Sequence, residues 1–200
     1  KTFDLRLKVI AFDEPIDSSN VNAEHWSVIG NIISSHQEFD GFVVLHGTDT
    51  MAYTASALSF MLKGLQKPVI LTGAQLPIAA PRTDARENII TAIEIASTKE
   101  NGKPKVPEVC IYFANMLLRG NRSRKVESIH FDAFESENYP ALAEAGIVID
   151  YNAKYINEID HNKNFSLIDS FDNNVVILKI FPRISKEVVH SILTTKNIKG

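Results

Sequence analysis

Two hydroxyl side chains flank a carboxylate in the segment Thr48-Asp49-Thr50. The apolar run before it, Phe42–Leu45, is typical of a buried strand, and Met51–Leu62 after it has helical apolar spacing. Ligands bind at the carboxyl ends of strands in parallel α/β sheets, and the free N–H groups of a helix start favour anions. Such a place suits hydroxyl chemistry, although Thr48, Asp49 or Thr50 could instead simply cap the helix.

A threonine hydroxyl needs a base to take its proton before it becomes a useful nucleophile. Lys125 is the candidate base, because the basic run Arg119–Lys125 follows a predicted strand over Val109–Phe113 and can approach the same edge of the sheet. Asp49 could hold the lysine in place. The alternative is that the run forms a solvated or phosphate-binding basic loop.

Two further segments follow predicted strands. The hydroxyls of Asp17–Asn20 could hold a substrate carboxylate or cap the next helix. Backbone groups of Thr72–Gln75 could stabilise an oxyanion or a water, or could form an ordinary turn. We expect His46 to have a structural role. Asp84, with the charged residues after it, fits a solvated helix face.

Composition excludes several classes of protein. A net charge of −3 argues against a general nucleic-acid binder, and no apolar run is long enough to cross a membrane. The histidines lack metal-ligand spacing, so no metal is expected. The single cysteine, Cys110, lies in an apolar run, and a buried reduced thiol fits a cytoplasmic protein.

Strand and helix patterns alternate along the first 150 residues. Ser18, Ser19 and Asn20 are candidate helix caps. The predicted strands are Leu7–Phe12, Phe42–Leu45, Pro68–Gly73 and Val109–Phe113, and the predicted helices are Ala23–Glu38, Met51–Leu62 and Thr83–Thr98. This order predicts an α/β fold with a mostly parallel sheet flanked by helices.

The pattern changes after residue 150. Tyr151–Asn174 is polar and aperiodic, whereas Val175–Phe181 reads as a strand and Ser185 as the cap of a last helix. One strand and one helix cannot bury their own apolar faces. The expected domains are therefore 1–153, an α/β domain whose start is missing, a linker over 154–174, and the truncated first βα unit of a second α/β domain over 175–200.

Several segments together resemble the bacterial-type L-asparaginases, and in detail the cytoplasmic type I enzymes. They are Asp17–Asn20, His46–Met51, Leu71–Pro77, Arg119–Lys125 and Phe131–Ser136. The resemblance runs over most of the chain to about Asp150 and implies the N-terminal domain fold of that family.

The resemblance implies a threonine-lysine-aspartate triad of Thr48, Lys125 and Asp49. It also implies that Ser18 binds the substrate α-carboxylate with Ser19 beside it, that Asp49 contacts the α-amino group, and that Ala74 positions a carbonyl or water. The implied reaction is hydrolysis of L-asparagine to L-aspartate and ammonia without a cofactor. The full-length enzyme would be a cytoplasmic homodimer or homotetramer, with no nucleic-acid or membrane partner.

One departure from the family pattern is that the chain has no Gly-Gly-Thr-Ile motif, which carries the family's first threonine. The expectation is a fragment that lacks this strand and most of the carboxyl-terminal domain, and that is inactive alone. Two other interpretations stay open: the asparaginase-like subunit of an archaeal glutamyl-tRNA amidotransferase, and a non-catalytic amino-acid-binding module.

Overall fold

The computed structural model describes residues 5–128, 130–160 and 162–199, and the chain divides into two compact units between residues 169 and 170. The α-helices are α1 (Ala23–Ser35), α2 (Met51–Met61), α3 (Ala85–Ser97) and α4 (Lys186–Leu193). The strands of the main sheet are β1 (Phe42–Leu45), β3 (Val69–Thr72), β6 (Val109–Phe113), β7 (Met116–Arg119), β10 (Ala143–Ala145) and β11 (Ile149–Tyr151). Short strands are β2 (Leu62–Lys63), β4 (Lys99–Glu100), β5 (Lys103–Pro104), β8 (Arg124–Lys125), β9 (Phe134–Glu135) and β12 (Ser166–Leu167).

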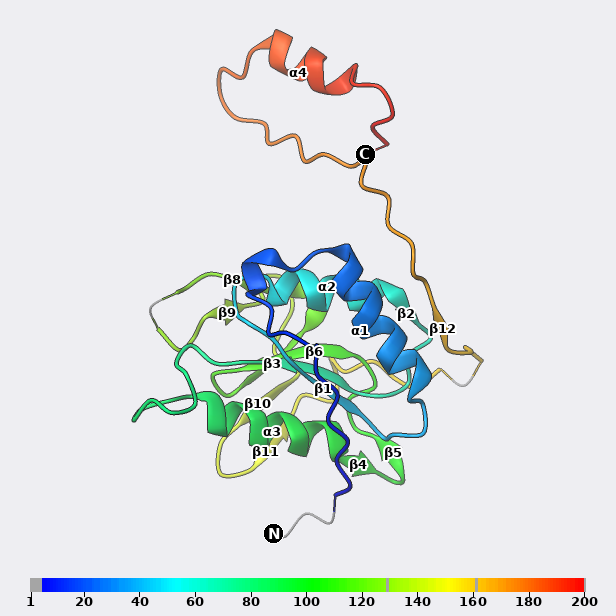
Figure 1. Cartoon of the computed structure of the whole chain (residues 1–200), viewed down its shortest axis with the longest axis vertical. Coiled ribbons are helices and arrows are strands. Elements are labelled where there is room, and N and C mark those ends of the chain that lie inside the picture. The colour runs from blue at the N-terminus through cyan, green and yellow to red at the C-terminus, as the bar shows by residue number, and fades with distance from the viewer. Residues whose placement is uncertain (1–4, 129, 161, 200) are drawn as a thin grey trace. The chain divides into compact units, whose positions relative to one another are not determined.

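The first unit is built on a six-stranded mixed sheet with the order β1-β3-β6-β7-β10-β11. The strands β1, β3 and β6 are parallel, and the register pairs Val44 with Leu71 and Leu71 with Ile111. From β6 onward each neighbour is antiparallel. Helices cover both faces, with α1 and α2 on one side and α3 on the other (Figure 1). The predicted α/β fold class is confirmed, with a mixed sheet whose parallel part is the core of β1, β3 and β6.

The central strand β6 shows why the sheet needs cover on both faces. All five of its residues are buried. Val109, Ile111 and Phe113 belong to the core shared with α1 and α2, whereas Cys110 and Tyr112 belong to the core shared with α3. A continuous apolar run is what a strand between two helical layers requires. The expected burial of Cys110 is confirmed.

The two parallel crossovers leave the sheet on opposite sides. The connection from β1 to β3 contains α2, and the connection from β3 to β6 contains α3, although both steps move in the same direction across the sheet. Successive crossovers in one direction lie on opposite faces only if their hands differ. One of them is therefore left-handed, against the usual right-handed rule.

Two predictions near the amino terminus are wrong. Leu7–Phe12 carries no regular secondary structure, and Val9 is 88% exposed, because no described strand pairs with this segment. The cap of α1 is Asn22, whose side chain accepts from the backbone of Glu24 and His25. The predicted caps Ser18–Asn20 instead form a short 3-10 helix that ends before α1 begins.

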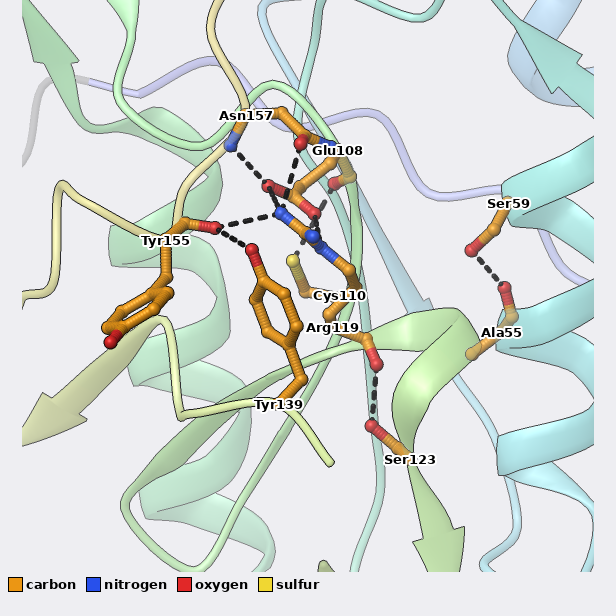
Figure 2. A network of polar contacts seen from close by, with 9 residues as sticks. All are labelled: Ala55, Ser59, Glu108, Cys110, Arg119, Ser123, Tyr139, Tyr155 and Asn157. Carbon is orange, nitrogen blue, oxygen red and sulfur yellow. Dashed lines mark hydrogen bonds and ion pairs between the residues drawn. The ribbon is translucent and has the colours of Figure 1, made fainter. Parts of the chain in front are cut away.

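The segment directly after β11, within the first unit, is held by the ion pair of Arg119 and Glu108. Arg119 contacts the Glu108 carboxylate at 2.6 Å and donates to the backbone oxygen of Tyr155 and the side chain of Asn157 (Figure 2). The Arg119 guanidinium also lies 4.2 Å from the ring centroid of Tyr139. Further along, β12 pairs with β2. The domain limits predicted from the sequence stay a proposal.

The second unit contains α4. Ser185 caps this helix by accepting from the backbone N–H of Val188, as its sequence predicts. The strand expected over Val175–Phe181 is absent, and Ile177 is 92% exposed. A strand forms only with a hydrogen-bonded neighbour, and the described part of this unit supplies none.

Candidate active site

The turn between β1 and α2 carries Thr48 and Asp49 to the carboxyl edge of the parallel strands. The N-cap residue Thr50 makes no side-chain cap hydrogen bond, and its hydroxyl donates to the backbone oxygen of Ser18 at 2.6 Å. The turn passes so close to Ser18 that a Cβ at Gly47 would lie 2.5 Å from the Ser18 hydroxyl. Helix capping therefore does not account for Thr50.

Lys125 reaches the same turn from a short hairpin. It lies on β8, where it pairs with Phe134 of β9, and the Phe134 ring packs edge-on against Phe113 at 5.1 Å. The Lys125 Nζ lies 2.9 Å from Thr48 Oγ1 and 2.8 Å from Asp49 Oδ1. The Lys125 side chain is 16% exposed and that of Asp49 59% exposed. The structure thus brings together all three residues of the expected triad.

The rest of the basic run is held by carboxylates of its own. Arg119 pairs with Glu108, and Arg124 pairs with Glu135 and Glu137. With Lys125 on Asp49, most of the positive charge of the run is already balanced. A loop that binds phosphate presents its cations to the ligand, so this arrangement speaks against the alternative of a basic phosphate-binding loop.

Gln75 is a contact of Thr48 that the sequence did not single out by its side chain. Its Nε2 donates to the backbone oxygen of His130 at 3.0 Å, which fixes the orientation of the amide. Its Oε1 then accepts the Thr48 hydroxyl at 3.2 Å. Gln75 follows β3, the strand next to β1, and that neighbourhood is the signal that could have identified it.

Asp84 fixes the turn that carries Gln75. Its carboxylate accepts from the backbone N–H of Gln75 at 3.0 Å and of Leu76 at 3.2 Å, and from the side chain of Asn88. Asn88 in turn donates to the backbone oxygen of Gly73. The expectation that Asp84 belongs to a solvated helix face is wrong, because the residue is half-buried and organises the loop before α3.

The candidate substrate-binding residues occupy the loops around this edge. Ser18 is 6% exposed and lies against Gly47. Ser19 is exposed, and its backbone N–H and hydroxyl donate to Asp17, which lowers the pKa of that carboxyl. Ala74 lies half-buried in the turn after β3. Ser18 is thus close to the Thr48 turn, whereas the Ser19 hydroxyl is engaged locally.

Within the described ranges, no three histidine, cysteine or acidic side chains are grouped in a way that could hold a metal ion. The Cys110 thiol is buried, and this burial raises its pKa well above the ordinary value. None of the described helices is long and apolar enough to span a membrane.

Comparison with known proteins decides the family. The protein-family model described as "Asparaginase, N-terminal" matches residues 6–157 of this chain. The chain belongs to the asparaginase family. The resemblance noted in the sequence is therefore confirmed.

The relatives of this chain carry more than one name. L-asparaginase 1 of Escherichia coli K12 is 42% identical over 182 residues, which are 89% of this chain and 51% of that protein. A human protein named 60 kDa lysophospholipase is 43% identical over 178 residues, which are 88% of this chain and 30% of that protein. The chain thus spans about half of these curated relatives, or less.

A solved structure supports the fold directly. L-asparaginase I from Vibrio cholerae superposes with a TM-score of 0.82 at 41% identity. The match covers 92% of this chain and 55% of that one. The asparaginase N-terminal fold is therefore shared over most of these residues.

Proposed function

We propose that the complete protein hydrolyses L-asparagine to L-aspartate and ammonia. The observation that supports this best is the contact of Lys125 with both Thr48 and Asp49, at 2.9 Å and 2.8 Å. A hydroxyl, a candidate base and a carboxylate within direct hydrogen-bonding distance form the unit that activated nucleophiles require. The names of the asparaginase relatives agree with this chemistry.

In the proposed reaction, Thr48 supplies the hydroxyl and Lys125 moves the proton. An unprotonated Lys125 Nζ accepts the Thr48 proton as the oxygen approaches the carboxamide carbon. The Thr48 oxygen forms an ester with the carboxamide carbon as the C–N bond breaks, and the proton is transferred to the nitrogen, which leaves as ammonia. Water then hydrolyses the ester, which releases aspartate and restores the Thr48 hydroxyl. Asp49 keeps the lysine nitrogen at the threonine throughout.

The binding half of the proposal uses the surrounding loops. Ser18 would hold the α-carboxylate with Ser19 beside it, Asp49 would hold the α-amino group, and Ala74 would position a carbonyl or a water. Support comes from the closeness of Ser18 to the Thr48 turn. The start of α2, which lacks a side-chain cap at Thr50, adds a favourable environment for negative charge.

The test is Lys125→Met in the complete protein, with ammonia release measured at millimolar L-asparagine. Methionine has a similar shape but cannot accept a proton, so turnover should fall by roughly four orders of magnitude or more. Arg124→Met is the matched control, because Arg124 is the neighbouring cation on β8 and its ion pairs are with Glu135 and Glu137. A Lys125 variant as active as this control would overturn the proposal.

The same assay bears on the remaining expectations. Turnover that requires an aminoacylated tRNA would favour the amidotransferase-subunit interpretation, and binding of asparagine without turnover would favour the binding module. The inactivity of these 200 residues alone, the homodimer or homotetramer and the cytoplasmic location stay predictions. Analytical ultracentrifugation of the complete protein tests the assembly.

A further inference from the structure

A chain of hydrogen bonds runs from α1 to the turn that carries Thr48. Trp26 Nε1 donates to Thr54 Oγ1 at 2.9 Å, Thr54 Oγ1 lies 2.8 Å from His46 Nε2, and His46 Nδ1 lies 2.7 Å from the backbone oxygen of Gly47. Thr54, on α2, is fully buried. None of the candidate triad residues takes part in this series of hydrogen bonds. The series nevertheless ends at Gly47, one residue before Thr48.

The hydrogen-bond partners of His46 indicate which of its ring nitrogens carries a hydrogen. A backbone oxygen can only accept, so the Nδ1 that contacts Gly47 carries the hydrogen. The Trp26 indole can only donate, so Thr54 Oγ1 accepts from it, and the Thr54 hydroxyl remains able to donate its own hydrogen to His46 Nε2. The contacts fit a neutral imidazole in the Nδ1–H tautomer, and we assign this form to His46. Burial lowers the pKa of His46, outweighing the bond to Gly47, and its two hydrogen-bond partners, Thr54 and Gly47, are uncharged.

The bond to Gly47 also sets the direction of the next N–H group. The peptide between Gly47 and Thr48 is trans and planar, so the Thr48 N–H points opposite to the Gly47 carbonyl. That carbonyl is aimed at the His46 ring, and the Thr48 N–H therefore points away from it. Across the described residues, the Thr48 N–H has no hydrogen-bond acceptor.

We propose that His46 is a positioning residue that locks the Gly47–Thr48 peptide and so presents the Thr48 N–H to the substrate beside the Thr48 hydroxyl. A fixed backbone donor next to the nucleophile can stabilise the negative charge that develops on the carboxamide oxygen. Without the imidazole, the peptide can rotate and offer its carbonyl instead. This catalytic consequence rests on the proposed function, whereas the tautomer and the locked peptide do not.

The first experiment examines the 200-residue chain and needs no variant. A long-range proton–nitrogen NMR spectrum of the histidine side chains should show His46 with a protonated Nδ1 and an unprotonated Nε2 at neutral pH. The Nε2–H tautomer, or a charged ring at neutral pH, would overturn the proposal whether or not the protein is an asparaginase.

The second experiment compares His46→Asn with His46→Gln in the complete protein. Asparagine can place its amide N–H near the position of Nδ1 and keep the donor to Gly47. Glutamine reaches the position of Nε2 and keeps only the contact with Thr54. We expect His46→Gln to lower kcat by about tenfold or more with little change in KM, and His46→Asn to stay within about threefold.

If His46→Asn lowers kcat more than His46→Gln does, His46 only anchors α2 through Thr54, and the positioning role is overturned. If the wild-type complete protein releases no ammonia, the proposed function fails. The tautomer spectrum then still decides whether the peptide is locked. The two failures are therefore distinguishable.

Discussion

Removing the guanidinium of Arg119 tests the energetic importance of the pair between β6 and β7. Glu108 is 7% exposed and accepts from Arg119 Nε at 2.6 Å, from Arg119 Nη2 at 3.1 Å and from the backbone of Asn157 at 2.8 Å (Figure 2). Burial acts to lower the pKa of Arg119, but the hydrogen bond and charge of Glu108 raise it on balance. Arg119 is therefore charged at any working pH.

The magnitude follows from what Arg119→Met leaves behind. Among the described residues, the Glu108 carboxylate would keep the Asn157 N–H as its remaining donor, and a buried charge without its counter-ion costs about 3–5 kcal/mol. With an m-value of roughly 2 kcal/mol/M, the urea midpoint should fall by about 1.5–2.5 M. Adding Glu108→Gln to Arg119→Met removes the charge and keeps an acceptor for Asn157. The double variant should therefore be more stable than the single one.

Urea unfolding followed by tryptophan fluorescence measures this loss. The chain has one tryptophan, Trp26, which lies on α1 in the first unit and reports on that unit alone. Arg124→Met is the control, because its pair with Glu135 is exposed and should contribute nothing measurable. The reasoning is refuted if Arg119→Met costs no more than the control, or if the double variant is the less stable one.

Three other perturbations have defined outcomes. Gly73→Ala places a Cβ 2.2 Å from the backbone oxygen of His46 and should cost at least about 1–3 kcal/mol in urea unfolding, whereas Gly146→Ala, whose nearest contact is 3.8 Å, should cost nothing. Asp84→Ala removes the acceptor of the Gln75 and Leu76 N–H groups, so both amides should exchange with deuterium faster, with those of β6 unchanged. The pKa of His46 is lowered in the folded state, so it contributes stability that is present above pH 6.5, the ordinary histidine pKa, and is lost as the pH falls through the pKa of the folded state. The wild type should therefore lose more stability than His46→Asn between pH 7 and pH 5.

The sequence predicts the elements that have strong and uniform patterns. Phe42–Leu45 and Val109–Phe113 form strands with the predicted bounds, and α3 lies within the predicted Thr83–Thr98. The β6–β7 hairpin was missed because its turn is Ala114-Asn115, with φ of 46° and 68°. Such turns are usually recognised by Asn-Gly or Asp-Gly. An alanine with positive φ gives no local signal and is held there by the ladder on either side.

Some residues of the candidate site are predictable from local sequence patterns, and others are not. Thr48 and Asp49 are predictable because a strand end before a helix start is a local pattern. Lys125 lies 76 residues from Asp49 and reaches it through the β8–β9 pairing, which no periodicity reveals. Gln75 and Asp84 depend on the path of the loop between β3 and α3. The resemblance indicates Lys125 by its motif, whereas the contacts of Gln75 and Asp84 depend on the three-dimensional path of the loop.

The handedness of the crossovers explains why the site lies where it does. In most open α/β sheets, a crevice forms where the strand order reverses, so that the connections leave toward opposite faces. Here the order β1-β3-β6 does not reverse, but the change of hand has the same effect. After β1 the chain turns toward α2, and after β3 it turns toward α3. Thr48 and Gln75 therefore meet at the point where the two connections diverge. The apolar pattern of a strand is the same for either hand, so this determinant of the site is set by the fold and not by any local sequence.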